Sequence, residues 1–89
     1  MAEKTIEEKL HEAQVVIGLR TRVDNLTKAM WFAMNSNNKN NLMDCVDNYK
    51  KTIGNLIKVG VHQDDIDAYN NTFKYLPWEA CGYEVPKLD

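Results

Sequence analysis

The sequence predicts an all-α fold, a long antiparallel helical hairpin followed by a third helix and an irregular aromatic C-terminal tail. Apolar residues recur at the three- and four-residue spacings of amphipathic helices along most of the chain. Four glycines and two prolines in 89 residues are few turn-forming residues for a many-stranded β fold. A chain of this length forms one small domain, residues 1–89, which buries only about 60–65% of the surface that its unfolded form exposes. The core is therefore expected to be thin.

The first helix is expected over residues 6–34. It begins at a capping box in which the Thr5 hydroxyl and the Glu8 carboxylate satisfy free backbone amides. It ends before a polar loop, residues 35–40. The second helix is expected over residues 41–59, with Gly60 as its C-terminal stop. Its apolar residues follow spacings of four and three: Leu42, Val46, Tyr49, Ile53 and Leu56.

The third helix is expected over residues 63–75, and Pro77 ends it. Three acidic residues near its start suit the positive end of the helix dipole: Asp64, Asp65 and Asp67. The tail that follows is expected to be irregular, with Trp78 and Tyr83 folded back as anchors.

The first helix carries two apolar seams that lie roughly 130° apart at 100° per residue. One seam covers its C-terminal half: Val16, Leu19, Val23, Leu26, Met30 and Ala33. The other covers its N-terminal half: Ile6, Leu10, Ala13 and Ile17. Two interpretations follow. Either the helix kinks near Gly18 so that the N-terminal half covers the third helix, or the N-terminal seam packs on a second subunit. We predict a homo-oligomer built through the N-terminal seam.

Composition limits the compartment and the class of partner. The longest unbroken apolar run, Ala29–Met34, is far too short to span a membrane. Residues 1–5 lack the basic start and apolar stretch of a signal peptide, and two cysteines suit a reducing compartment. The sequence therefore predicts a cytoplasmic protein with no membrane partner.

Charge is unevenly distributed along the chain. Residues 35–60 carry four lysines against two aspartates, whereas residues 61–89 carry two lysines against six acids. The acidic end argues against DNA as a partner, because phosphate contacts need a basic footprint. The mildly basic middle is where a small anionic ligand would bind.

No pattern in the sequence predicts an enzyme, a metal site or a cofactor. The soft metal ligands are His11, Cys45, His62 and Cys81, and the closest two are 17 residues apart. Structural zinc sites pair their ligands at spacings of two to five. Both cysteines are interpreted as packing residues, and the acidic group at residues 64–67 as a helix N-terminal feature.

A ligand site is predicted on the hairpin from the register of two antiparallel helices. With the turn near Asn38, Arg20 and Lys50 flank the apolar seam on the same side, with Thr27 between them. Trp31 shares that side, either Trp31 or Tyr49 could stack on a base, and Arg22 flanks the opposite side. An Arg fork and a Lys point charge both suit phosphate. The alternative is a solvated flank in which Arg20 pairs with Asp24 at the helical i, i+4 spacing.

The segment IGLRTRVDNLTKAMW, residues 17–31, leads into the second helix of a short, acidic-tailed chain rich in Asn and Lys. Over residues 5–60 this arrangement resembles a small early protein of T-even-type phages. The helical hairpin with basic flanks is similar to phage anti-CBASS proteins. The resemblance implies a non-enzymatic counter-defence protein that sequesters a cyclic oligonucleotide signal inside a helical oligomer, in the host cytoplasm.

A second function remains open on the residues themselves. The acidic third helix and tail could cover a basic surface of a host protein and inhibit it. The acids concerned are Asp64, Asp65, Asp67, Glu79, Glu84 and Asp89. A basic hairpin flank favours the cyclic-oligonucleotide sponge, whereas an exposed acidic face favours the inhibitor.

Overall fold

The computed structural model describes residues 5–88, and within them the fold is all-α with no strand. Three helices follow one another along the chain: α1 (Ile6–Asn35), α2 (Lys39–Lys58) and α3 (Gln63–Lys74). A single 3₁₀ turn, η1 (Glu79–Cys81), interrupts the tail. The predicted helical hairpin and third helix are therefore confirmed, with every helix end within two residues of its predicted position.

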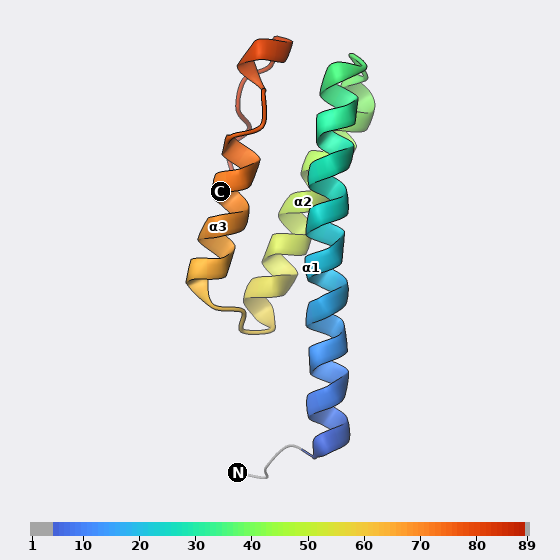
Figure 1. The fold of residues 1–89 in the computed structure, drawn as a ribbon, viewed down its shortest axis with the longest axis vertical. Helices are drawn as coiled ribbons and strands as arrows, with labels where there is room; N and C mark the ends of the chain where they lie inside the picture. The colour runs from blue at the N-terminus through green and yellow to red at the C-terminus, as the bar shows by residue number, and fades with distance from the viewer. Residues whose placement is uncertain (1–4, 89) are drawn as a thin grey trace.

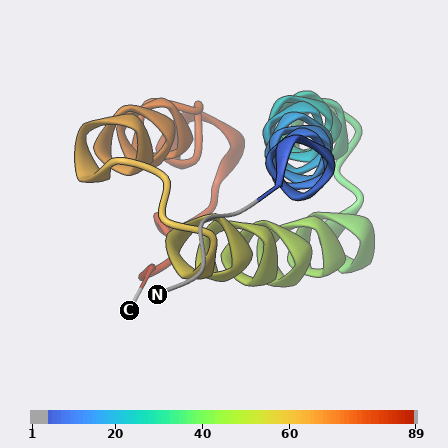
Figure 2. The same cartoon turned by 90° about the horizontal axis from the view of Figure 1, so that it is seen from below.

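The three helices form an elongated bundle measuring 52 × 19 × 15 Å. Helix α2 runs antiparallel to α1, and α3 runs back alongside α2 in the opposite direction (Figure 1). Viewed from the end, α1 and α3 lie on the same side of α2 (Figure 2). Because α2 supplies the common packing surface, α1 and α3 face each other across a groove that side chains of both helices line.

Both interhelical connections are short, and each contains a residue in the left-handed region. Asn37 (φ 58°) follows α1 and Gly60 (φ 86°) follows α2. After α2, the Gly60 N–H donates to the Ile57 carbonyl and the Val61 N–H to the Leu56 carbonyl, both at 3.1 Å. This pair of bonds is the Schellman arrangement, which satisfies the last carbonyls of a helix. The predicted stop at Gly60 is confirmed.

The helix N-termini are capped by side chains. The Thr5 hydroxyl accepts from the Glu8 N–H at 3.1 Å, as predicted. Helix α2 starts at Lys39 rather than residue 41, because the Asn38 carboxamide accepts from the Asn41 N–H and begins the helix early. In α3 the cap is His62, whose Nδ1 accepts from the Asp64 N–H at 3.1 Å. Asp64 and Asp65 lie in the first turn of α3, as predicted, but do not cap it.

The core lies between α1 and α2 and extends under α3. All five predicted apolar residues of α2 are buried, and every member of the C-terminal seam of α1 is buried or half-buried. The buried apolar side chains are Val23, Met30, Ala33, Met34, Leu42, Cys45, Val46, Tyr49, Ile53, Leu56, Ile66, Phe73 and Trp78.

Three aromatic rings in contact join α2, α3 and the tail. Tyr49 stacks on Phe73 with ring centroids 4.6 Å apart, and Phe73 contacts Trp78 at 5.1 Å. The buried Trp78 indole N–H donates to the Phe73 carbonyl at 2.7 Å, which satisfies its one polar group. Tyr83 is half-buried, and its N–H donates to the Trp78 carbonyl. The predicted anchoring role of Trp78 and Tyr83 is confirmed, although the tail contains the helical turn η1.

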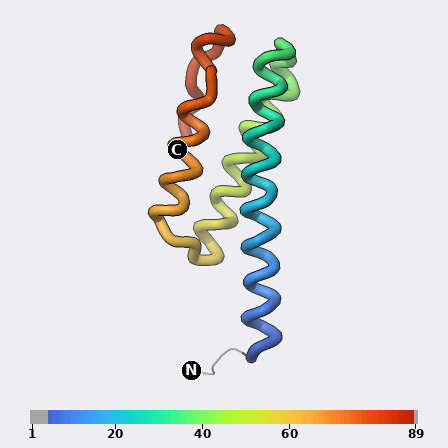
Figure 3. The backbone as a smooth tube through the Cα atoms, in the orientation of Figure 1, coloured from blue at the N-terminus to red at the C-terminus, as the bar shows by residue number. Residues whose placement is uncertain are grey.

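Helix α1 continues through Gly18 without a break, and its N-terminal half projects beyond the ends of α2 and α3 (Figures 1 and 3). The interpretation that a kink lets this half cover α3 is therefore wrong. Ile6, Leu10 and Ile17 are 77%, 58% and 63% exposed, and Ala13 is exposed as well. A single glycine in an otherwise strong helical segment costs only about 1 kcal/mol, which is too little to break it.

Candidate functional site

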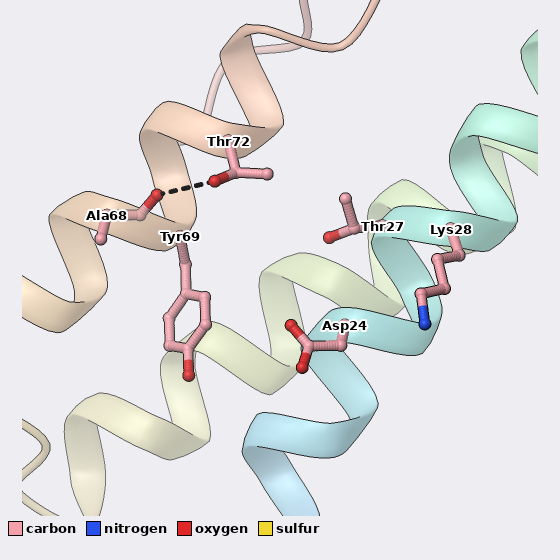
Figure 4. Close-up of a pocket in the computed structure, with 6 residues that line it drawn as sticks. All are labelled: Asp24, Thr27, Lys28, Ala68, Tyr69 and Thr72. Atoms are coloured by element: carbon pink, nitrogen blue, oxygen red, sulfur yellow. Dashed lines mark hydrogen bonds between the residues drawn. The ribbon is translucent and has the colours of Figure 1, made fainter.

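A groove between α1 and α3 is a candidate site on the described surface. It has a volume of about 390 Å³ and is open to solvent. It is lined by Asp24, Thr27 and Lys28 of α1 and by Ala68, Tyr69 and Thr72 of α3. Asp24 and Thr27 point from α1 towards α3, and Tyr69 points from α3 towards α1 (Figure 4). The groove follows from the fold, because α1 and α3 both pack on α2.

Arg20 lies beside the groove and joins α1 to α3. Its Nη1 donates to the Tyr69 hydroxyl and its Nη2 to Asp65 Oδ2, both at 3.0 Å. The hydrogen bonds to Asp65 and then Tyr69 raise the pKa of Arg20. The guanidinium carbon also lies 6.0 Å from the centre of the Tyr69 ring.

This pairing replaces the i, i+4 pair expected between Arg20 and Asp24. On α3 the guanidinium finds a carboxylate and a hydroxyl and makes a hydrogen bond to each. Asp24, the exposed neighbour on its own helix, offers only a carboxylate. Within residues 5–88, Asp24 has neither an ion pair nor a hydrogen bond to its carboxylate. Its charge faces the groove.

Three hydroxyl groups give the groove both hydrogen-bond acceptors and a donor. Thr27 donates to the Val23 carbonyl at 2.9 Å, and Thr72 donates to the Ala68 carbonyl at 3.1 Å. Both threonine oxygens therefore keep lone pairs that can accept. The Tyr69 hydroxyl accepts from Arg20, so its own proton is free to be donated to a ligand.

The structure brings together part of the predicted ligand site. Thr27 lines the groove and Arg20 borders it through Tyr69. Lys50 and Arg22 are exposed and are not among the lining residues. Trp31 is 46% exposed and packs edge-to-face on Phe32, with ring centroids 5.3 Å apart, also outside the groove.

The sequence analysis did not place Asp24 and Lys28 at the candidate site, nor the three lining residues from α3. Asp24 follows Arg20 by four residues, so 100° per residue places it about 40° from Arg20 on the surface of α1. That signal was present in the sequence. The residues from α3 had no such signal, because their position depends on where α3 packs.

Outside the groove, two buried groups have shifted acidities and structural roles. Burial raises the pKa of the Cys45 thiol, with a further contribution from Asp44. Burial also raises the pKa of Tyr49, whose hydroxyl donates to the Asn70 side chain at 3.0 Å.

Within residues 5–88, no three His, Cys, Asp or Glu side chains gather where they could hold a metal ion. No helix in this part of the chain is long and apolar enough to cross a membrane.

The acidic residues at the start of α3 differ in how far they are engaged. Asp64 has a side chain 87% exposed, and the Asp65 side chain, which binds Arg20, is 51% exposed. Asp67 accepts a hydrogen bond from Gln63 at 2.9 Å. The α3 face is acidic, but part of its charge is already paired within the chain.

Comparison with known proteins finds no family, no curated protein and no solved structure that matches this chain. The chemistry of the groove and of the exposed α1 seam therefore carries the functional argument.

Proposed function

We propose that this chain is a non-enzymatic binding protein, a phage-type counter-defence protein that sequesters a cyclic oligonucleotide signal in the host cytoplasm. One observation carries the proposal: the α1/α3 groove combines a lysine, three hydroxyls and an adjoining arginine in a single open site. Its volume of about 390 Å³ falls in the range of small-molecule sites.

The groove offers separate contacts to the phosphate and to the rest of such a ligand. Lys28 has no ion-pair partner among residues 5–88 and supplies a point charge for a phosphate. Arg20 uses two of its five N–H donors on Asp65 and Tyr69, which leaves three donors for a ligand beside the groove. The threonine oxygens can accept from ribose hydroxyls.

Self-association would complete this open site. The α1 seam of Ile6, Leu10, Ala13 and Ile17 is exposed along a helix that no other part of residues 5–88 covers. We propose that a second copy covers it, because small domains often gain stability by oligomerising. In a symmetric assembly, Arg22 or Lys50 of a neighbouring copy could then face a ligand from the opposite flank.

The acidic face supports a second candidate, an inhibitor that covers a basic surface of a host protein. The exposed carboxylate of Asp64 favours it. The pairing of Asp65 with Arg20 weakens it, because that charge already has a partner within the chain.

Calorimetric titration of the full chain with cyclic di- and trinucleotides tests the proposal. We expect Lys28→Ala to weaken binding about tenfold or more, since a hydrogen bond to a charged group contributes roughly 1.5–3 kcal/mol. Lys51→Ala removes an equal charge from an exposed position of α2 outside the groove and should leave binding unchanged. Affinity should fall as salt rises, because partly exposed phosphate contacts are screened.

Arg20→Ala should weaken binding as well, but it also releases α3 from α1. Its thermal unfolding must therefore be measured beside its affinity. If no cyclic nucleotide gives heat or a thermal shift with the unaltered chain, the sponge is rejected and the acidic-face inhibitor becomes the leading function.

A further inference from the structure

We propose that the α1/α3 groove selects ligands that carry guanine, and that Asp24 is the residue that reads the base. This inference rests on the proposed function, which leaves the base composition of the ligand open. It starts from Asp24, a carboxylate that lines the groove without an ion-pair or hydrogen-bond partner among residues 5–88.

The unpaired carboxylate restricts what can lie beside it. A phosphate placed next to Asp24 would meet a like charge, which is unfavourable at contact distance. The ligand must therefore turn its phosphates towards Lys28 or Arg20 and present N–H donors to Asp24. An aspartate is an acceptor at both oxygens, so a group with two adjacent N–H donors fits it best.

Guanine is the common base whose Watson–Crick edge has that pattern. Its N1–H and its exocyclic amino group lie side by side, and together they can donate to both oxygens of one carboxylate. Bonds of this charge-assisted, two-point kind are stronger and more directional than neutral ones. Nearby, the Tyr69 hydroxyl can donate to an acceptor such as the guanine carbonyl, since its lone pair is occupied by Arg20.

Adenine cannot make the same contact. Its Watson–Crick edge offers one amino donor beside N1, which is an acceptor and would face a carboxylate oxygen. Two opposed acceptors form no hydrogen bond, so adenine gains less than guanine from contact with this carboxylate. The other lining residues do not distinguish the bases, since Lys28 contacts phosphate and the threonines offer only acceptors.

The test compares cyclic di-GMP and cyclic di-AMP by calorimetry on the unaltered chain and on Asp24→Asn. We expect the unaltered chain to bind cyclic di-GMP about tenfold or more tightly than cyclic di-AMP. An asparagine has one acceptor and one donor, a pattern that pairs with adenine in two-point contacts. Asp24→Asn should therefore reverse or abolish the preference.

Asp47→Asn is the matched control, because it removes the same charge from an exposed position of α2 outside the groove. It should keep the preference of the unaltered chain. If Asp24 acted only by repelling phosphate, Asp24→Asn would tighten both ligands equally, and that result would overturn the proposal. Equal affinities of the unaltered chain for cyclic di-GMP and cyclic di-AMP would also overturn it, but would not contradict the proposed function. If neither ligand binds, and no cyclic trinucleotide binds, the guanine preference and the proposed function are both rejected.

Discussion

The two halves of α1 share one continuous helix but differ completely in their surroundings. In the C-terminal half, Val23 and Met30 are 1% and 0% exposed against α2. In the N-terminal half, Ile6 and Ile17 are 77% and 63% exposed. Both halves carry an apolar seam at helical spacing. An apolar seam therefore indicates that a helix face needs a partner, but does not say whether that partner lies in the same chain.

The difference has an energetic consequence. Helices shorter than about 12–15 residues are marginal in water when nothing packs on them. The projecting half of α1 is supported by the Thr5 cap and by its continuity with the packed half. We expect it to open locally far more readily than the packed half unless a second copy covers it.

The largest contrast should come from truncating one apolar residue in each half. Met30→Ala removes a fully buried side chain and should lower the free energy of unfolding by about 2–5 kcal/mol. Leu10→Ala removes an exposed side chain and should change the stability of the single chain by no more than about 0.5 kcal/mol. Denaturant unfolding followed by circular dichroism measures both.

Repeating this pair at several protein concentrations sharpens the comparison. If a second copy covers the seam, the effect of Leu10→Ala grows with concentration, whereas that of Met30→Ala does not depend on assembly in this way. Equal losses for the two variants at high dilution would show that the N-terminal half is packed within the single chain.

The next effect concerns assembly itself. Leu10→Glu places a charge in the middle of the exposed seam and should convert an oligomer into smaller species, because an unpaired charge is costly in an apolar interface. Light scattering gives the mass directly. Glu7→Gln, which changes an exposed residue outside the seam, is the control and should leave the mass unchanged. An unaltered chain that is monomeric at tens of micromolar would refute self-association through this seam.

The smallest effect is expected at the boundary between the two halves. A Cβ atom at Gly18 would meet no atom within 4 Å, and the residue lies inside the helix. Gly18→Ala should therefore raise the free energy of unfolding by about 0.5–1 kcal/mol.

Gly60→Ala is the matched comparison for this boundary. It should destabilise by about 1–2 kcal/mol because Gly60 has φ 86° in the turn after α2. Thermal unfolding of the two variants measures this difference: the melting temperature should rise for Gly18→Ala and fall for Gly60→Ala. A loss of stability in Gly18→Ala would mean that a bend at this position is needed after all.

Much of the fold was predictable from the sequence because local signals and packing agree. The Thr5 cap, the stop at Gly60 and the apolar spacing of α2 all depend on residues within a turn or two of one another. Helix α2 began two residues early because an asparagine at position 38 is a good N-cap, and the run of asparagines did not distinguish which one would serve.

The candidate site was less predictable. Arg20 and Thr27 were predicted as ligand contacts from helical periodicity, and in the structure Thr27 lines the groove while Arg20 binds Tyr69 at its edge; their role as ligand contacts stays a prediction. The partner of Arg20 was wrong: Asp65 lies 45 residues away, and a local i, i+4 neighbour was available. Lys50, Arg22 and Trp31 remain predictions as ligand contacts, although none of them lines the groove of the single chain.

The sequence by itself determined which segments are helical, where they begin and end to within two residues, and which face of each is apolar. These properties depend on backbone hydrogen bonding and on side-chain spacing within one helix. The tertiary structure alone decided that α3 lies beside α1 on the same side of α2, that Arg20 pairs with α3, and that Asp24 faces the groove unpaired. The physical reason is that contacts between helices depend on how buried surfaces such as the Tyr49, Phe73 and Trp78 stack fit together, which no spacing along the chain encodes.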